Sequence, residues 1–203
     1  GEFNQVPVIA GITRDEASIF TAGYGVTNDA LLGAYIRAFG TSMEIEDLDE
    51  MVALYTSEAY GSPKAAFDAF YGDILFVCPT RSFLSSISQY VPTRGYRWSH
   101  APNFAGDLGA YHGSELTFIF GTLSDEYNDE ERSLANIMQS AWWSVATEQP
   151  EVDSVGAWPL FDAGGGVTAD GGTWIDLDTE RSVMPGVRRE TCDYWDSLGW
   201  QKY

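Results

Sequence analysis

Basic side chains are scarce in this chain, and lysine is almost absent. Its 203 residues include 30 acidic and 11 basic side chains, a formal net charge of −19, and only Lys64 and Lys202 are lysines. Such a charge repels nucleic-acid phosphates and anionic lipid headgroups. We therefore expect neither nucleic acid nor a membrane surface as a partner. The excess carboxylates either solvate the surface or attract a cationic substrate.

Long apolar runs are also missing. No stretch of eighteen apolar residues occurs, so the sequence predicts no membrane span. The opening residues, GEFNQVPVIAG, carry neither the basic start nor the apolar core of a signal peptide. Because a chain can begin after processing, this observation does not decide where the protein is found.

Cysteine is nearly absent, with only Cys78 and Cys192 present. Two cysteines are too few for a structural zinc site, and their separation excludes a redox pair of the Cys-x-x-Cys kind. From the residues alone, they either pair across the domain or remain buried thiols.

The apolar residues that are present, 44% of the chain, suffice for one domain with a sizeable core. Their spacing predicts strands at 6–11, 96–101 and 174–177, and helices at 29–39, 63–73, 74–90, 115–120, 128–148 and 188–198. Asn28 and Ser62 are the expected caps of the first two helices. The glycine-rich stretch 162–172 is expected to be a loop. This order predicts an α/β fold, in which functional loops follow the carboxyl ends of strands.

One of only two histidines, His112, lies in such a loop, within the sequence GAYHGSEL. It is either a turn residue satisfied by the backbone or a positioned proton carrier. A metal site built on His112 and Glu115 would need more ligands than the neighbouring sequence offers. We expect Glu115 to have a structural role, and the other histidine, His100, to be a packed or edge residue.

A carboxylate that could orient His112 follows the first predicted strand. In hydrolytic triads a buried carboxylate fixes the tautomer of the histidine, and in α/β hydrolases the acid precedes the base in the chain. Glu16 and His112 obey that order. The sequence has no G-x-S-x-G nucleophile motif and no HGGG-like oxyanion stretch. An acid and a base are therefore present without the serine that they would activate.

Five segments in the correct order resemble the type-B carboxylesterase family, which includes the cholinesterases and fungal lipases. VPVIAGITRDEASIF is similar to the family's acid loop and GAYHGSELTFIFG to its histidine loop. The others are GDILFVCP, RRETCDYWDSL and MQSAWWSVATEQPEVDSVGAWPLFD. The similarity extends over most of residues 1–198.

This resemblance implies an α/β-hydrolase fold in which Glu16 is the acid, His112 the base, and Cys78 and Cys192 form a disulfide. The family's nucleophile and oxyanion motifs lie upstream of its acid loop. Residues 1–203 are therefore expected to be the C-terminal portion of one catalytic domain, inactive alone. Its partner is an N-terminal portion that carries the serine and the oxyanion hole. Ester hydrolysis by such a triad needs neither a cofactor nor a metal.

The substrate is expected to be an ester with an aryl or alkyl group. Ile19 stands where choline-selective members carry an aromatic residue, which removes a cation–π contact worth roughly 0.5–2 kcal/mol. Ile19 and Phe20 place an apolar wall beside the acid, and Tyr111 and Phe118 are candidates for the acyl pocket. The implied disulfide favours secretion, because such bonds persist in oxidising compartments.

Two alternative functions are consistent with the same sequence segments. One is a non-catalytic adhesion or binding module of cholinesterase-like fold, and the other is an acyltransferase that uses the same triad. Among the remaining side chains, Asp73 is expected to order the loop beneath the site, and Trp142 and Trp143 are expected to lie in the core.

Overall fold

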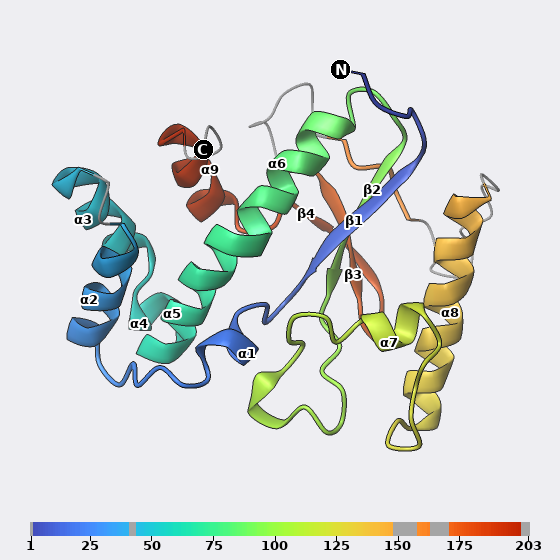
Figure 1. Ribbon diagram of the computed structural model, residues 1–203, viewed down its shortest axis with the longest axis horizontal. Coiled ribbons are helices and arrows are strands. Elements are labelled where there is room, and N and C mark those ends of the chain that lie inside the picture. Colours follow the sequence, from blue (N-terminus) through green and yellow to red (C-terminus); the bar gives the residue numbers. More distant parts are fainter. Residues whose placement is uncertain (1, 41–43, 148–157, 163–170, 200–203) are drawn as a thin grey trace.

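A four-stranded mixed sheet organises the computed structural model, which describes residues 2–40, 44–147, 158–162 and 171–199 (Figure 1). The strands, in spatial order, are β1 (Val8–Thr13), β2 (Thr93–Trp98), β3 (Thr173–Leu177) and β4 (Ser182–Pro185). The first three strands are parallel, and β4 is antiparallel to β3. The expected α/β architecture is confirmed.

Helices cover both faces of this sheet. They are α1 (Ser18–Thr21), α2 (Asp29–Phe39), α3 (Ile45–Leu54), α4 (Ser57–Tyr60), α5 (Pro63–Gly72), α6 (Cys78–Ile87), α7 (Leu116–Ile119), α8 (Asp129–Ala146) and α9 (Arg189–Ser197). A π-helical turn, η1 (Asp73–Val77), joins α5 to α6, and a 3-10 turn, η2 (Gly106–Leu108), precedes α7. None of the helices in the described ranges is long and apolar enough to cross a membrane.

Each face of the sheet buries its own core, because neighbouring strand residues point in opposite directions. Trp174 packs with residues of α2, α3, α5, α6 and α9, whereas Ile175 packs with residues of α7 and α8. Figure 1 shows α8 on one side of the sheet and α2 to α6 on the other. The result is three layers, with the loops after β1 and β2 at one end of the sheet.

Local signals predicted the starts of α2 and α5 correctly, whereas the helix expected from residue 74 begins only at Cys78, after a π-helical turn. The Asn28 side chain accepts a hydrogen bond from the Leu31 amide, and the Ser62 hydroxyl accepts one from the Ala65 amide. These contacts satisfy amide groups that a helix leaves without an intrahelical partner. The long helix α8 begins at a capping box, in which Asn128 and Glu131 cap one another's backbone amides.

Other elements differ from expectation. Strands β1 and β2 lie at 8–13 and 93–98 rather than at 6–11 and 96–101. The sequence analysis did not find α3, whose many carboxylates obscure a short apolar face, nor β4, whose residues are mostly exposed. Trp143 is 71% exposed and was wrongly placed in the core, because its neighbour Trp142 takes the inward direction on α8. The expected glycine-rich loop lies mostly outside the described residues.

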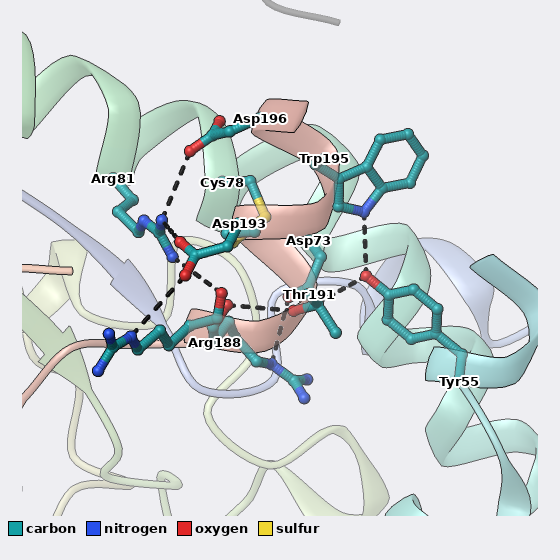
Figure 2. Close-up of a disulfide and its surroundings, with 11 residues drawn as sticks. Tyr55, Asp73, Cys78, Arg81, Arg188, Thr191, Asp193, Trp195 and Asp196 are labelled. Carbon is teal, nitrogen blue, oxygen red and sulfur yellow. Dashed lines mark hydrogen bonds and ion pairs between the residues drawn. A yellow bond between two sulfur atoms is a disulfide. The ribbon is translucent and has the colours of Figure 1, made fainter. Parts of the chain in front are cut away.

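A disulfide between Cys78 and Cys192 joins α6 to α9, as the resemblance implied. Both cysteines are buried in the larger core. Next to them, Asp73 has no exposed surface and accepts hydrogen bonds from Tyr55 and Thr191, both 2.9 Å long (Figure 2). Burial and the nearby Asp73 charge raise the pKa of Tyr55, which keeps its phenol protonated as a donor.

Polar contacts hold α9 on both sides of the disulfide. The Nε of Arg188 lies 3.2 Å from the second oxygen of Asp73, and its guanidinium lies over the ring of Tyr60. Farther along the helix, the buried Arg81 pairs with Asp193 and Asp196 (Figure 2). The terminal helix is therefore fixed to α6 and η1 by one covalent bond and several charged contacts.

Replacement of both cysteines, Cys78→Ala with Cys192→Ala, should lower the free energy of unfolding by about 2–5 kcal/mol. The reason is that the bond closes a sequence separation of 114 residues and so restricts the unfolded chain. Urea denaturation monitored by circular dichroism measures the loss. Reduction of the wild-type protein is the control and should lower its stability by a similar amount. Equal stability of the oxidised wild type and the double variant would contradict the prediction.

Candidate active site

Glu16 lies just beyond the end of β1 and is 5% exposed. One of its carboxylate oxygens, Oε1, accepts a hydrogen bond from the Thr13 amide at 2.6 Å. The other, Oε2, lies 2.6 Å from Nδ1 of His112. Because a carboxylate only accepts, Nδ1 carries the proton of this hydrogen bond. The buried acid thus fixes the tautomer of the imidazole and leaves Nε2 as the acceptor nitrogen.

The loops that carry these two residues are joined by further hydrogen bonds. The Asp15 amide donates to the Ala110 carbonyl at 3.0 Å, and the Ala110 amide donates to the Asp15 carboxylate at 2.8 Å. The Ser18 hydroxyl donates to the Leu108 carbonyl at 2.7 Å. Three bonds besides the Glu16–His112 contact therefore set the separation of the loops.

Glycine is required where the loops come closest. Gly109 has φ +64° and ψ −141°, a conformation that residues with a side chain rarely adopt. A Cβ atom at this position would lie 2.3 Å from the Asp15 carboxylate. The absence of a side chain allows the histidine loop to approach the acid loop.

The imidazole of His112 lies against two aromatic rings. The ring centroid of Phe76 is 4.3 Å away with an interplanar angle of 32°, and that of Phe20 is 5.4 Å away. The His112 side chain is 44% exposed, and no residue in the described part of the chain hydrogen-bonds its Nε2. That nitrogen can therefore exchange a proton with a group that approaches from outside.

The sequence comparisons agree with this geometry. The model of the carboxylesterase family matches residues 1–195. The chain belongs to the carboxylesterase family. It is 27% identical to an acetylcholinesterase of Bungarus fasciatus over 97% of this chain and 35% of the relative. It is 28% identical to the para-nitrobenzyl esterase of Bacillus subtilis (strain 168), over 79% of this chain and 33% of the relative.

Membership of the carboxylesterase family places the four-stranded sheet within an α/β-hydrolase fold. An acetylcholinesterase of Leptinotarsa decemlineata matches 98% of the chain at 25% identity. The chain spans about a third of the length of these three relatives.

Two candidate wall residues, Ile19 and Phe20, lie on α1 and are 44% and 47% exposed. Phe20 also contacts the His112 ring, so this apolar surface borders the imidazole. Tyr111 is half-buried and forms an isolated bridge with Asp15. Phe118 has no exposed surface and packs against Trp98 in the smaller core, so in this carboxylesterase chain it is a core residue rather than part of an open wall.

His100 and Ser114, the serine nearest to His112 in the sequence, form their hydrogen bonds with residues other than His112. The two ring nitrogens of His100 lie 2.9 Å from Asp178 and 3.2 Å from Glu131. Ser114 is buried, and its hydroxyl accepts a hydrogen bond from the indole of Trp98 at 2.9 Å. Among the described residues, no group of three or more His, Cys, Asp and Glu side chains is arranged to hold a metal ion.

Glu115 is a second buried carboxyl group near the site. Burial and the neighbouring Glu16 charge raise its pKa. Its Oε1 lies 3.4 Å from the Tyr96 hydroxyl, and its Oε2 has no hydrogen-bond partner in the described ranges. It lies at the start of α7, where a structural role was expected.

Three further residues, Phe76, Asp15 and Ser18, belong to the site but are not evident from the sequence. Asp15 directly precedes Glu16 in the segment VPVIAGITRDEASIF, and it joins the two loops. Phe76 stood within the quoted segment GDILFVCP, but no spacing in that segment indicates that a π-helical turn directs its ring to His112. Only the tertiary structure reveals that contact.

The substitution Gly109→Ala should lower the free energy of unfolding by about 1–3 kcal/mol through backbone strain, and by more through collision with Asp15. Gly106→Ala is the matched control, because Gly106 has φ +56° and an added Cβ atom would meet nothing within 4 Å. It should cost only the strain of a positive φ, about 1–2 kcal/mol. Thermal and urea denaturation measure both. Equal losses would mean that the close approach to Asp15 does not matter.

Replacement of Glu115 by glutamine should stabilise the protein increasingly as pH rises. Folding raises the pKa of Glu115. Such a carboxyl group makes its full contribution to the free energy of unfolding at pH values below its unfolded pKa, and the wild-type protein loses that contribution as the pH rises through the folded pKa. Glutamine carries no charge at any of these pH values. Urea titrations at a series of pH values from 4 upward, an interval set by the ordinary value of about 4.3 for a glutamate, test this. The exposed Glu180→Gln is the control. A pH-independent difference would contradict the prediction.

Proposed function

We propose that this chain supplies the acid and the base of a serine carboxylesterase, which cleaves carboxylic esters through an acyl-enzyme. The observation that carries the proposal is the contact of 2.6 Å between the buried Glu16 and Nδ1 of His112. Family membership supports ester hydrolysis as the reaction.

In the proposed reaction His112 transfers protons and Glu16 balances its charge. Nε2 of His112 takes the proton of a serine hydroxyl, and the serine oxygen attacks the ester carbonyl carbon. The proton then passes from Nε2 to the leaving alcohol oxygen as the tetrahedral intermediate collapses to the acyl-enzyme. In the second half-reaction a water molecule gives a proton to Nε2 and attacks the acyl carbon. The proton then passes from Nε2 to the serine oxygen as the carboxylic acid product is released. Glu16 stays ionised throughout and stabilises the imidazolium that forms in each half-reaction.

The serine and the oxyanion-hole donors are proposed to lie on a portion of the same enzyme outside these 203 residues. Two observations support this. The chain spans about a third of the length of its relatives. Among the described strands, β1 pairs only with β2, so its other edge is open to a strand of that portion.

The proposed substrates are esters with an aryl or alkyl group beside the histidine. Ile19 and Phe20 present apolar surface there, and the relative from Bacillus subtilis is a para-nitrobenzyl esterase. An aliphatic residue at position 19 gives a quaternary ammonium no ring face, which disfavours choline esters. No cofactor takes part in the proposed reaction. Secretion is proposed from the Cys78–Cys192 disulfide, because such bonds persist in oxidising compartments.

The proposal is tested with a fluorophosphonate probe, which reacts with an activated serine. The protein is purified with every polypeptide that accompanies this chain, labelled, and analysed by intact mass under denaturing, non-reducing conditions. We expect the label on a serine outside residues 1–203. His112→Gln and Glu16→Gln should each slow labelling, and kcat for para-nitrophenyl acetate should fall by up to about 10⁴-fold.

The matched control is His100→Gln, which removes the only other histidine of the chain. It should leave the labelling rate near that of the wild type at a temperature where all variants are folded. Absence of label from every polypeptide in the sample would overturn the proposal and favour a non-catalytic binding module. A labelled protein that transfers its acyl group to an acceptor other than water would favour an acyltransferase.

A further inference from the structure

The ring of Phe76 covers one face of the His112 imidazole. Their centroids are 4.3 Å apart and their planes are inclined by 32°, which is close to stacking. Phe20 stacks on Phe76 at 5.7 Å with an interplanar angle of 19°, so the two phenyl rings form a continuous apolar shelf beside the histidine. Neither ring has a polar atom that could hydrogen-bond the imidazole. Their contribution is therefore steric and dispersive.

A hydrogen bond to Glu16 does not by itself fix the plane of the imidazole. The bond restrains χ2, because Nδ1 lies off the Cβ–Cγ axis, but a hydrogen bond tolerates bending, and χ2 is broad for histidine, so the ring keeps some freedom about χ2. The direction of Nε2 depends on that torsion. An aromatic ring packed against the imidazole face restricts the turn, because rotation would drive the two rings into contact.

Phe76 reaches this position through an irregular helical turn. In η1 the Cys78 amide donates to the Asp73 carbonyl, five residues earlier, instead of to the residue four earlier as in an α-helix. The turn inserts one extra residue between α5 and α6. Such turns recur at functional sites. Here it lets Asp73 and Val77 face the core while Phe76 meets the imidazole.

Both ends of this turn are tied to α9. At its start, Asp73 accepts a hydrogen bond from Thr191 at 2.9 Å and pairs with Arg188 at 3.2 Å (Figure 2). Directly after its end, Cys78 is bonded to Cys192. The backbone that carries Phe76 is thus held between a buried charged contact and a covalent bond.

We propose that Phe76 is a positioning residue, which sets the plane of the His112 imidazole and so the direction of Nε2. The proposal rests on the proposed function, because the orientation of Nε2 matters only if His112 transfers a proton. Phe76 acts through His112 and not on the ester. Loss of its ring should therefore lower kcat and leave KM nearly unchanged.

The test compares Phe76→Leu with Phe83→Leu, the same substitution at an exposed phenylalanine of α6. With para-nitrophenyl acetate as substrate, Phe76→Leu should lower kcat by about 10- to 100-fold, the range expected for a misplaced catalytic group. Phe76→Tyr, which keeps an aromatic ring, should restore most of the rate. Phe83→Leu should have no effect. A rise in KM with unchanged kcat in Phe76→Leu would overturn the proposal, since that result indicates contact with the substrate.

A second measurement does not depend on activity. In protein labelled with ¹³C-histidine, the Hε1 resonance of His112 is assigned by its loss in His112→Gln. The stacked phenyl ring shields that proton, so Phe76→Leu should shift the resonance downfield, while Phe76→Tyr and Phe83→Leu should leave it near its wild-type position. An unchanged resonance in Phe76→Leu would overturn the positioning role. If the wild-type protein is inactive but Phe76→Leu still shifts the resonance, the proposed function is overturned and the contact between Phe76 and His112 is upheld.

Discussion

The parallel pairing of β1 with β2 is the constraint on which the candidate site depends. In their register Thr13 lies opposite Trp98, so the two strands leave the sheet at the same edge. The loops that follow them meet there, and their hydrogen bonds bring Glu16 and His112 into contact. Antiparallel strands would have sent these loops to opposite edges. The separation of 96 residues between Glu16 and His112 is thus bridged by sheet geometry.

Three buried carboxyl groups lie in or near this arrangement, and different groups offset the cost of burying each one. Asp73 has a guanidinium and two hydroxyl donors, although burial still raises its pKa. Glu16 has a backbone amide and the imidazole. Glu115 has the Tyr96 phenol at 3.4 Å, a backbone hydrogen bond and the nearby His112, yet burial and the Glu16 charge still raise its pKa. A buried charge is costly unless it is paired, so the network at Asp73 is suited to anchoring a helix, while Glu115 is the least stabilised of the three as an anion.

The same network connects stability to the geometry of the histidine. The disulfide and the Asp73 contacts hold α9 against η1, and η1 carries the ring that lies under His112. The contacts that anchor α9 in the core therefore also hold the backbone that carries the ring beside His112. The exposed surface of Ile19 and Phe20 is apolar, in contrast to the net charge of −19.

Much of the local structure could be predicted from the sequence. Asn28 and Ser62 cap helices through contacts three residues away, and such short-range signals are present in the sequence itself. The family resemblance predicted the contact of Glu16 with His112 and the disulfide, because the segments that carry these residues keep a recognisable order. The limits of the strands could not be predicted as well. The pairing of Val8–Thr13 with Thr93–Trp98 sets the ends of β1 and β2, and the apolar runs in the sequence do not.

By itself, then, the sequence determined the α/β class and the helix caps, and its family resemblance predicted the contact of Glu16 with His112 and the Cys78–Cys192 disulfide. Only the tertiary structure decided that Phe76 faces the imidazole, that Phe118 lies in the core, and that Gly109 admits the Asp15 carboxylate. The physical reason is the range of the interactions involved. Caps and periodic patterns act within a few residues, whereas ring stacking, burial and the close approach of loops depend on segments that meet only after the sheet has formed.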